Sequence, residues 1–137
     1  PGLDGSIEIE PGNRLPLVPE HMLKVFADLR LTARLDIDVN VIATSGSYAR
    51  GNENNAHEPD GEYYLGEGAV DGYAIVNVGA RYGLTSRIQV IGQVNNLFDQ
   101  KYYLWGDIRQ ADATNPVAVD FYSQPGRNVR VALQADF

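Results

Sequence analysis

The sequence predicts an all-β fold, an antiparallel meander of about five strands whose pattern is typical of a transmembrane β-barrel. Three observations support this prediction. Apolar and polar residues alternate with a period of two in five stretches. The connections between these stretches alternate between tight turns and long loops. One face of each stretch is mostly Leu, Val, Ile and Ala, whereas the other carries charges, amides and a few aromatic rings.

The first two predicted strands span residues 21–31 and 35–45, and the short connection 32–34 joins them. Alternate residues of the first strand are apolar: Leu23, Val25, Ala27, Leu29 and Leu31. The second strand shows the same alternation: Leu35, Ile37, Val39, Val41 and Ala43. Because so short a connection forms a tight hairpin turn, the two strands are expected to pair antiparallel.

The third and fourth predicted strands, 73–83 and 87–98, are joined by a second tight turn at 84–86. Their apolar faces are Ala74, Val76, Val78, Ala80 and Tyr82 on the third strand, and Ile88, Val90 and Val94 on the fourth. The fifth predicted strand, 126–137, alternates up to its last residue: Val129, Val131, Leu133, Ala135 and Phe137. Period-two alternation of this kind predicts a strand with one apolar face.

Two long segments, about 46–72 and 99–123, are predicted to be loops at the end of the sheet opposite the tight turns, an asymmetry that outer-membrane barrels show. Each alternating stretch has about 10 or 11 residues, close to the roughly 9–11 that cross a bilayer at a tilt. Strands of soluble proteins more often have about 5 or 6. The pattern leaves one alternative open, a soluble sandwich whose apolar face packs on a second sheet.

Composition excludes several classes of function. The net charge of −7 argues against a nucleic-acid partner, which would require a basic patch. The chain has no cysteine, so thiol catalysis and cysteine-ligated zinc are excluded. No apolar run is longer than "YYLW" at 102–105, which is too short for a membrane-spanning helix.

No catalytic or metal-binding constellation is expected, and no cofactor is predicted. Asp36 and Asp38 share a strand face, but the neighbouring strands offer several cationic partners, so charge pairing is the plainer interpretation. Those cations are Lys24, Arg30, Arg81 and Arg130. His21 and His57 lie in different segments, and the carboxylates of the loop 46–72 do not have the spacing of a calcium loop. The sequence therefore does not predict an enzyme.

Four motifs, in order along the chain, resemble the TonB-dependent outer-membrane receptors. They are "RLPLVPEH" (14–21), "GYAIVNVGARYGLTSRIQV" (72–90), "VNNLFDQKYY" (94–103) and "QPGRNVRVALQADF" (124–137). The resemblance covers nearly the whole chain and is strongest to the C-terminal portion of the family's barrel. It identifies residues 1–137 as a C-terminal barrel segment, with the plug domain and TonB box absent from this chain.

The resemblance implies a function and a set of partners. The family's receptors are 22-stranded barrels in the outer membrane of Gram-negative bacteria. They take up a scarce ligand, such as a ferric siderophore or another metal chelate, with energy delivered through TonB to an N-terminal segment. Expected partners are outer-membrane lipid, TonB, the barrel assembly machinery and the small-molecule ligand. Five strands cannot close a barrel, so an isolated fragment is expected to self-associate.

Ligand contacts are expected in the long loops, where the family uses aromatic and arginine side chains. The candidate ligand-binding residues are Tyr48, Arg50, Tyr63, Tyr64, Trp105 and Arg109. By resemblance, the terminal aromatic residue and the alternating apolar residues before it form an assembly signal: Val129, Val131, Leu133, Ala135 and Phe137. The alternative function is that of a soluble all-β ligand- or carbohydrate-binding module.

Overall fold

The structure, a computed structural model, describes residues 8–56, 68–109 and 118–137, with side chains omitted at 107–109 and 118–122. All regular secondary structure in these residues is β-strand. The strands are β1 (Met22–Arg30), β2 (Leu35–Thr44), β3 (Ser47–Tyr48), β4 (Ala69–Val70), β5 (Tyr73–Gly83), β6 (Ile88–Asn95), β7 (Tyr103–Arg109), β8 (Ala118–Ser123) and β9 (Asn128–Ala135). The described residues include no helix that is long and apolar enough to cross a membrane.

The chain divides into two compact units. The strand unit contains Met22–Ala43, Tyr73–Lys101 and Pro125–Phe137. The loop unit contains Pro1–His21, Thr44–Gly72 and Tyr102–Gln124. Each unit is therefore assembled from three separate parts of the sequence, and each is described separately below.

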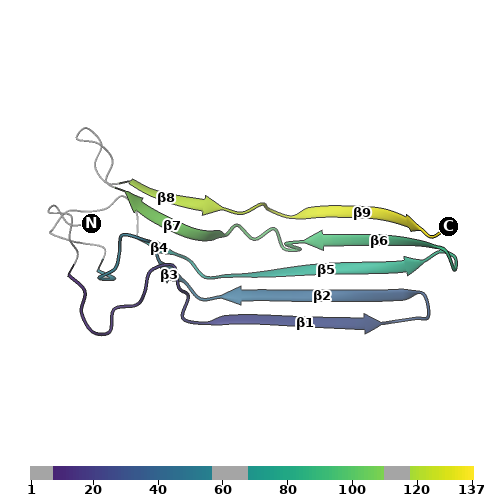
Figure 1. Cartoon of the computed structure of the whole chain (residues 1–137), viewed down its shortest axis with the longest axis horizontal. Helices are drawn as coiled ribbons and strands as arrows, with labels where there is room; N and C mark the ends of the chain where they lie inside the picture. The colour runs from purple at the N-terminus through teal and green to yellow at the C-terminus, as the bar shows by residue number, and fades with distance from the viewer. Residues whose placement is uncertain (1–7, 57–67, 110–117) are drawn as a thin grey trace. The chain divides into compact units, whose positions relative to one another are not determined.

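The strand unit is one five-stranded sheet in the order β1-β2-β5-β6-β9. Neighbouring strands point in opposite directions, so the predicted antiparallel meander is confirmed (Figure 1). The N–H of Leu31 donates to the carbonyl of Leu35 (3.0 Å) and that of Leu84 to the carbonyl of Ile88 (2.9 Å), which closes the two tight turns. β6 ends at Asn95, before the predicted boundary, because Asn96 adopts a φ of 53°.

The register of β5, β6 and β9 explains the two faces of the sheet. Val78 is opposite Val94, and Val94 is opposite Val129, so these side chains lie on the same face. On the other face, Gln93 is opposite Arg130. A shift of one residue would move every apolar side chain to the polar face. The alternation of apolar and polar residues in the sequence therefore corresponds to the alternation of side chains between the two faces of the sheet.

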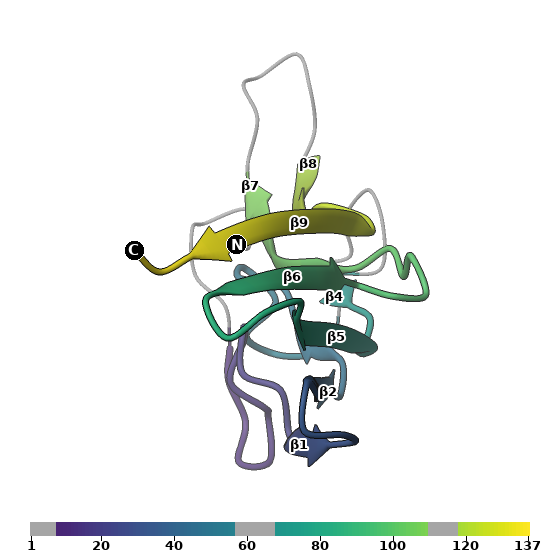
Figure 2. The same ribbon diagram turned by 90° about the vertical axis from the view of Figure 1, so that its right-hand side faces the viewer.

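The apolar face of the strand unit is uncovered. The five strands form a single layer, and the unit has no second sheet to pack on it (Figure 2). Val131 keeps 74% of its surface exposed, and Leu23 on the other edge strand keeps 57%. Among the described residues the buried apolar side chains are Ala49, Val70 and Ile75. A face this apolar requires an apolar environment. In a soluble sandwich a second sheet would cover it, and this unit has no such sheet.

The loop unit contains two short two-stranded sheets, β3-β4 and β7-β8, both antiparallel. They lie within the segments 46–72 and 99–123, which the sequence predicts to be loops. β3 and β4 have two residues each, which is too few to show an alternating pattern. The β7-β8 pairing has an irregularity between Tyr103 and Gly106, which interrupts the alternation there.

Candidate functional site

The two parts of the loop unit that flank β1 and β2 are held together by backbone hydrogen bonds. The N–H of Leu17 donates to the carbonyl of Tyr48 at 2.8 Å. His21 and Ser45 bond reciprocally: the N–H of Ser45 donates to the carbonyl of His21 (2.9 Å), and the N–H of His21 to the Ser45 hydroxyl (3.0 Å). These contacts attach the segment 10–21 to β3.

The side chain of Arg14 makes three contacts in the loop unit. Its Nη2 donates to the carbonyl of Gly46 (3.1 Å), and its guanidinium carbon lies 5.4 Å from the centre of the Tyr48 ring. Its Nη1 is 3.7 Å from a carboxylate oxygen of Glu20. A guanidinium at this distance from an aromatic ring makes a cation–π interaction. Arg14 therefore connects the first part of the chain to the Tyr48 side chain.

Asn55 holds the backbone of Arg14 from both sides. Its Oδ1 accepts the N–H of Arg14, and its Nδ2 donates to the Arg14 carbonyl (3.0 Å) and to the Asn52 carbonyl (3.2 Å). Asn55 has a φ of 60°, in the left-handed region that asparagine tolerates better than most residues. A side-chain amide here replaces the pairing that a neighbouring strand would supply.

Asn52 is the most buried polar residue among those described, with 1% of its surface exposed. Its Nδ2 donates to the carbonyl of Gly68 (2.9 Å), and the same carbonyl accepts the N–H of Ala49 (2.8 Å). The Arg50 N–H donates to the carbonyl of Gly106 in β7 (2.9 Å). These bonds connect the segment after β3 to both β4 and β7.

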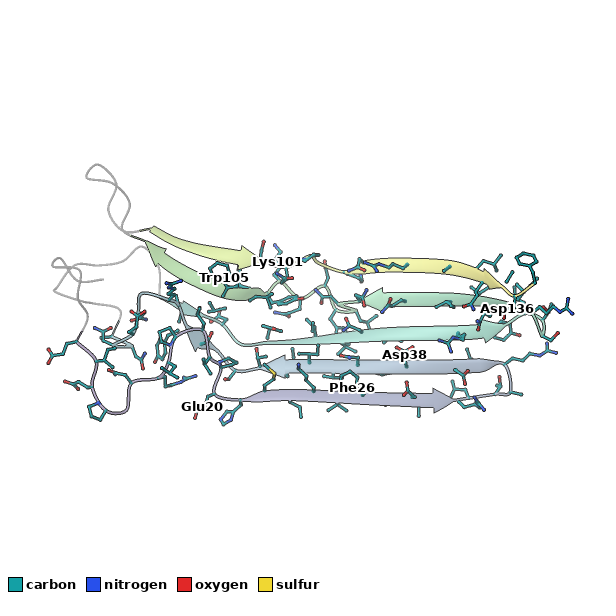
Figure 3. All side chains as sticks on the ribbon, viewed as in Figure 1. Glu20, Phe26, Asp38, Lys101, Trp105 and Asp136 are labelled. Atoms are coloured by element: carbon teal, nitrogen blue, oxygen red, sulfur yellow. The ribbon has the colours of Figure 1, made fainter. Side chains whose placement is uncertain are left out.

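Three of the candidate ligand-binding residues belong to the loop unit. Tyr48 is half-buried in β3, and Arg50 is exposed. Trp105, labelled in Figure 3, is 36% exposed on β7. Tyr63 and Tyr64 lie outside the described residues. Arg109 ends β7, where the structure describes only its backbone.

Arg14, Asn52 and Asn55 belong to this arrangement but are not among the site residues that the sequence predicts. Asn55 and Arg14 are 41 residues apart in the sequence, so no local pattern relates them. The signal that was available is the run "NENN" at 52–55, because asparagine is frequent where the backbone adopts left-handed conformations.

A second asparagine-centred turn follows β6 in the strand unit. Asn96 is 4% exposed, and its side chain bonds both backbone groups of Gln100: Nδ2 to the carbonyl (2.8 Å) and Oδ1 from the N–H (2.9 Å). Its own N–H donates to Oδ1 of Asn77 in β5 (2.9 Å). The turn is therefore fixed to the neighbouring strand as well as to itself.

The same turn is bonded to the start of β9. Oδ1 of Asp99 accepts the N–H of Arg127 (2.7 Å), and the Arg127 guanidinium reaches the carbonyl of Leu97 (3.5 Å). A Cβ atom at Gly126 would lie 2.6 Å from Oδ1 of Asp99, so glycine leaves room for this bond. We call Asn96, Asp99, Gly126 and Arg127 the β6–β9 clamp.

Asn96→Gly tests the clamp. Glycine keeps the positive φ but removes the two side-chain bonds to Gln100, so we expect the free energy of unfolding to fall by about 1–2 kcal/mol. Urea unfolding of the complete receptor in detergent measures it. Gln93→Ala, on an exposed position of β6, is the control and should change stability little. Equal losses in both variants would contradict a specific role for Asn96.

The polar face of the strand unit has a shallow hollow of about 510 Å³ that is lined in part by charged side chains. Nε of Arg30 lies 3.1 Å from Oδ1 of Asp36, which confirms the predicted charge pairing for this pair. Asp38 extends over Gly79 of β5, where a Cβ atom would overlap its carboxylate. Among the described residues, no three His, Asp or Glu side chains group in a way that could hold a metal ion.

The residues of the predicted assembly signal lie at the C-terminal edge of the sheet. Val129, Val131 and Leu133 are exposed on the apolar face of β9. Phe137 follows the strand and is fully exposed. The structure thus places Val129, Val131 and Leu133 on one surface, and the role of the five residues in assembly stays a prediction.

Comparison with known proteins gives a consistent result. A family model described as "TonB dependent receptor-like, beta-barrel" matches residues 3–97. The chain is 28% identical over 132 residues to the ferric enterobactin receptor PirA of Pseudomonas aeruginosa, covering 96% of this chain and 16% of that protein. It is 27% identical to the ferrienterobactin receptor of Escherichia coli, covering 92% of this chain and 17% of that protein.

Solved structures resemble the fold. The siderophore receptor PiuA from Acinetobacter baumannii aligns with a TM-score of 0.65 at 16% identity, covering 89% of this chain and 14% of that one. A mutant of the ferric enterobactin receptor PfeA from Pseudomonas aeruginosa aligns with a TM-score of 0.64 at 23% identity, covering 87% and 16%. The chain thus spans about a sixth of the length of the curated relatives it matches. With an antiparallel sheet, an uncovered apolar face and a family match over most of its residues, the chain belongs to the TonB-dependent receptor β-barrel family.

Proposed function

We propose that this chain is the C-terminal barrel segment of an outer-membrane receptor that takes up a ferric siderophore of the catecholate type. The observation that carries the proposal is the match over 96% of the chain to a ferric enterobactin receptor. The fold supports it, because an uncovered apolar face suits a wall that contacts lipid.

The proposal assigns the two faces of the strand unit. The face with Val78, Val94 and Val129 contacts outer-membrane lipid, and the face with Gln93 and Arg130 lines the barrel interior. The edge strands β1 and β9 have one hydrogen-bonded neighbour each in the described sheet, so both pair with further strands in the complete barrel. TonB acts through an N-terminal part of the receptor, and the assembly machinery reads the end of β9.

The ligand-binding role falls to the loop unit. Ferric catecholate complexes are anionic and present aromatic rings, which suit the guanidinium of Arg50 and the rings of Tyr48 and Trp105. The backbone bond from Arg50 to Gly106, the neighbour of Trp105, keeps these segments adjacent. Tyr63, Tyr64 and Arg109 remain candidates on the same reasoning from residue type.

The double substitution Tyr48→Ala/Arg50→Ala tests the proposal. It removes an aromatic surface and a positive charge, so we expect Kd for ferric enterobactin to rise at least about tenfold, equivalent to ~1.4 kcal/mol. Binding is measured by quenching of tryptophan fluorescence on the purified complete receptor. Arg87→Ala, in the tight turn before β6, removes the same charge elsewhere and should leave Kd unchanged.

Two results would count against the proposal. A complete receptor that binds no ferric catecholate would remove the function. A receptor that binds the complex equally well with and without Tyr48 and Arg50 would keep the function and remove these two residues from the site.

A further inference from the structure

We infer that Arg14 is a positioning residue for the ligand site, which acts by fixing the ring of Tyr48 and is itself fixed by Asn55. This inference rests on the proposed function, since it gives Tyr48 a ligand to contact. Arg14 was not among the candidates chosen from the sequence, and it comes from a segment well before β3.

The guanidinium of Arg14 contacts three groups of the loop unit. One nitrogen donates to the Gly46 carbonyl, another faces Glu20, and the plane lies near the Tyr48 ring. Its side chain is 38% exposed. A guanidinium with these contacts contributes to ligand binding by holding its partners in place.

The backbone bonds of Tyr48 do not by themselves orient its ring. Tyr48 belongs to a two-residue strand, where it is opposite Ala69, and its carbonyl accepts the N–H of Leu17. These bonds fix the position of the backbone and leave rotation about the side-chain bonds free. The cation–π contact with Arg14 restricts that rotation, and a ring held in its binding orientation loses less entropy when a ligand arrives.

Asn55 determines where Arg14 can be. Both backbone groups of Arg14 bond to the Asn55 side chain, which also bonds to the carbonyl of Asn52. Asn52 is buried and bonded to Gly68. Through Asn55, the backbone of Arg14 is therefore anchored to this buried residue of the loop unit. The order of dependence is therefore Asn52, Asn55, Arg14 and then the Tyr48 ring.

A double-mutant cycle on the complete receptor tests this inference, with Kd for ferric enterobactin as the readout. We expect Arg14→Met to raise Kd about two- to fivefold, the range of a partly exposed cation–π contact. In the Tyr48→Ala background, the same substitution should have no further effect, because the ring it positions is gone. In the Tyr48→Phe background, which keeps the ring, the effect should return.

Two further variants separate positioning from charge and from folding. Arg87→Met removes a guanidinium from the tight turn before β6, outside the loop unit, and should leave Kd unchanged. Asn55→Gly keeps the positive φ but releases Arg14, so it should raise Kd like Arg14→Met. Heat-modified mobility on gels verifies that each variant is folded, and Arg14→Lys, which lacks the planar fork, replaces Arg14→Met if that variant misfolds.

The outcomes are distinguishable. If the unmodified receptor binds the complex and Tyr48→Ala weakens binding, but the Arg14 and Tyr48 effects are additive, the positioning role is overturned and the proposed function stands. If Tyr48→Ala leaves Kd unchanged, the inference fails together with the role of Tyr48. If the unmodified receptor binds no ferric catecholate, the proposed function fails and takes the inference with it.

Discussion

Gly72→Ala is expected to destabilise the receptor by about 1–3 kcal/mol, the range for an overpacked site. A Cβ atom at Gly72 would lie 2.7 Å from the carbonyl oxygen of Thr44 and 3.0 Å from the nitrogen of Gly46. Both are backbone atoms, so no side-chain rotation relieves the overlap. Gly72 thus lets two backbone segments pass closely where the chain enters β5. Urea unfolding of the complete receptor in detergent measures the loss.

Gly92→Ala is the matched control for this prediction. Gly92 lies inside β6, opposite Val131, and a Cβ atom there meets nothing within 4 Å. Alanine restricts the unfolded chain, so this substitution should stabilise the receptor slightly, by about 0.5 kcal/mol. If the two glycine substitutions change stability equally, close backbone packing at Gly72 is not the cause.

Val131→Arg is the second substitution with a large expected effect. Val131 is exposed on the apolar face of β9, and in the proposed barrel that face contacts lipid. An arginine near the middle of the bilayer costs about 2–4 kcal/mol in barrels, falling toward the interfaces. We expect a lower free energy of unfolding in lipid vesicles and less folded receptor in outer-membrane fractions.

The neighbouring residue supplies the control for Val131. Ala132 is opposite Ile91 on the other face of the same strand, so Ala132→Arg places the same side chain in the proposed barrel interior. We expect it to cost much less than Val131→Arg, because interior-facing positions tolerate charge. Similar costs at both positions would mean that the two faces do not differ in environment.

The strand unit was predictable from the sequence because its side chains alternate between an apolar and a polar face with a period of two. Alternation over long stretches identified all five strands of the sheet, and the short turns identified two of its four pairings, β1 with β2 and β5 with β6. The early end of β6 was not predicted, because it depends on the buried side-chain bonds of Asn96. Such bonds leave no periodic signal.

The loop unit was predictable only in part. Tyr48, Arg50 and Trp105 were chosen by residue type, and the structure places all three in one unit. The strands β3, β4, β7 and β8 were missed, because they are short or interrupted. Arg14 and Asn55 were missed because their contact joins residues far apart in the sequence, and only the folded chain brings them together.

The β6–β9 clamp has a consequence for how such receptors diversify. Asp99 and Arg127 are bonded at 2.7 Å, so the two ends of the intervening segment 100–126 meet regardless of what lies between them. Each doubling of the length of a flexible loop adds only about 0.6 kcal/mol to the free energy of bringing its ends together. Insertions and exchanges in this segment can therefore accumulate while the pairing of β6 with β9 is preserved.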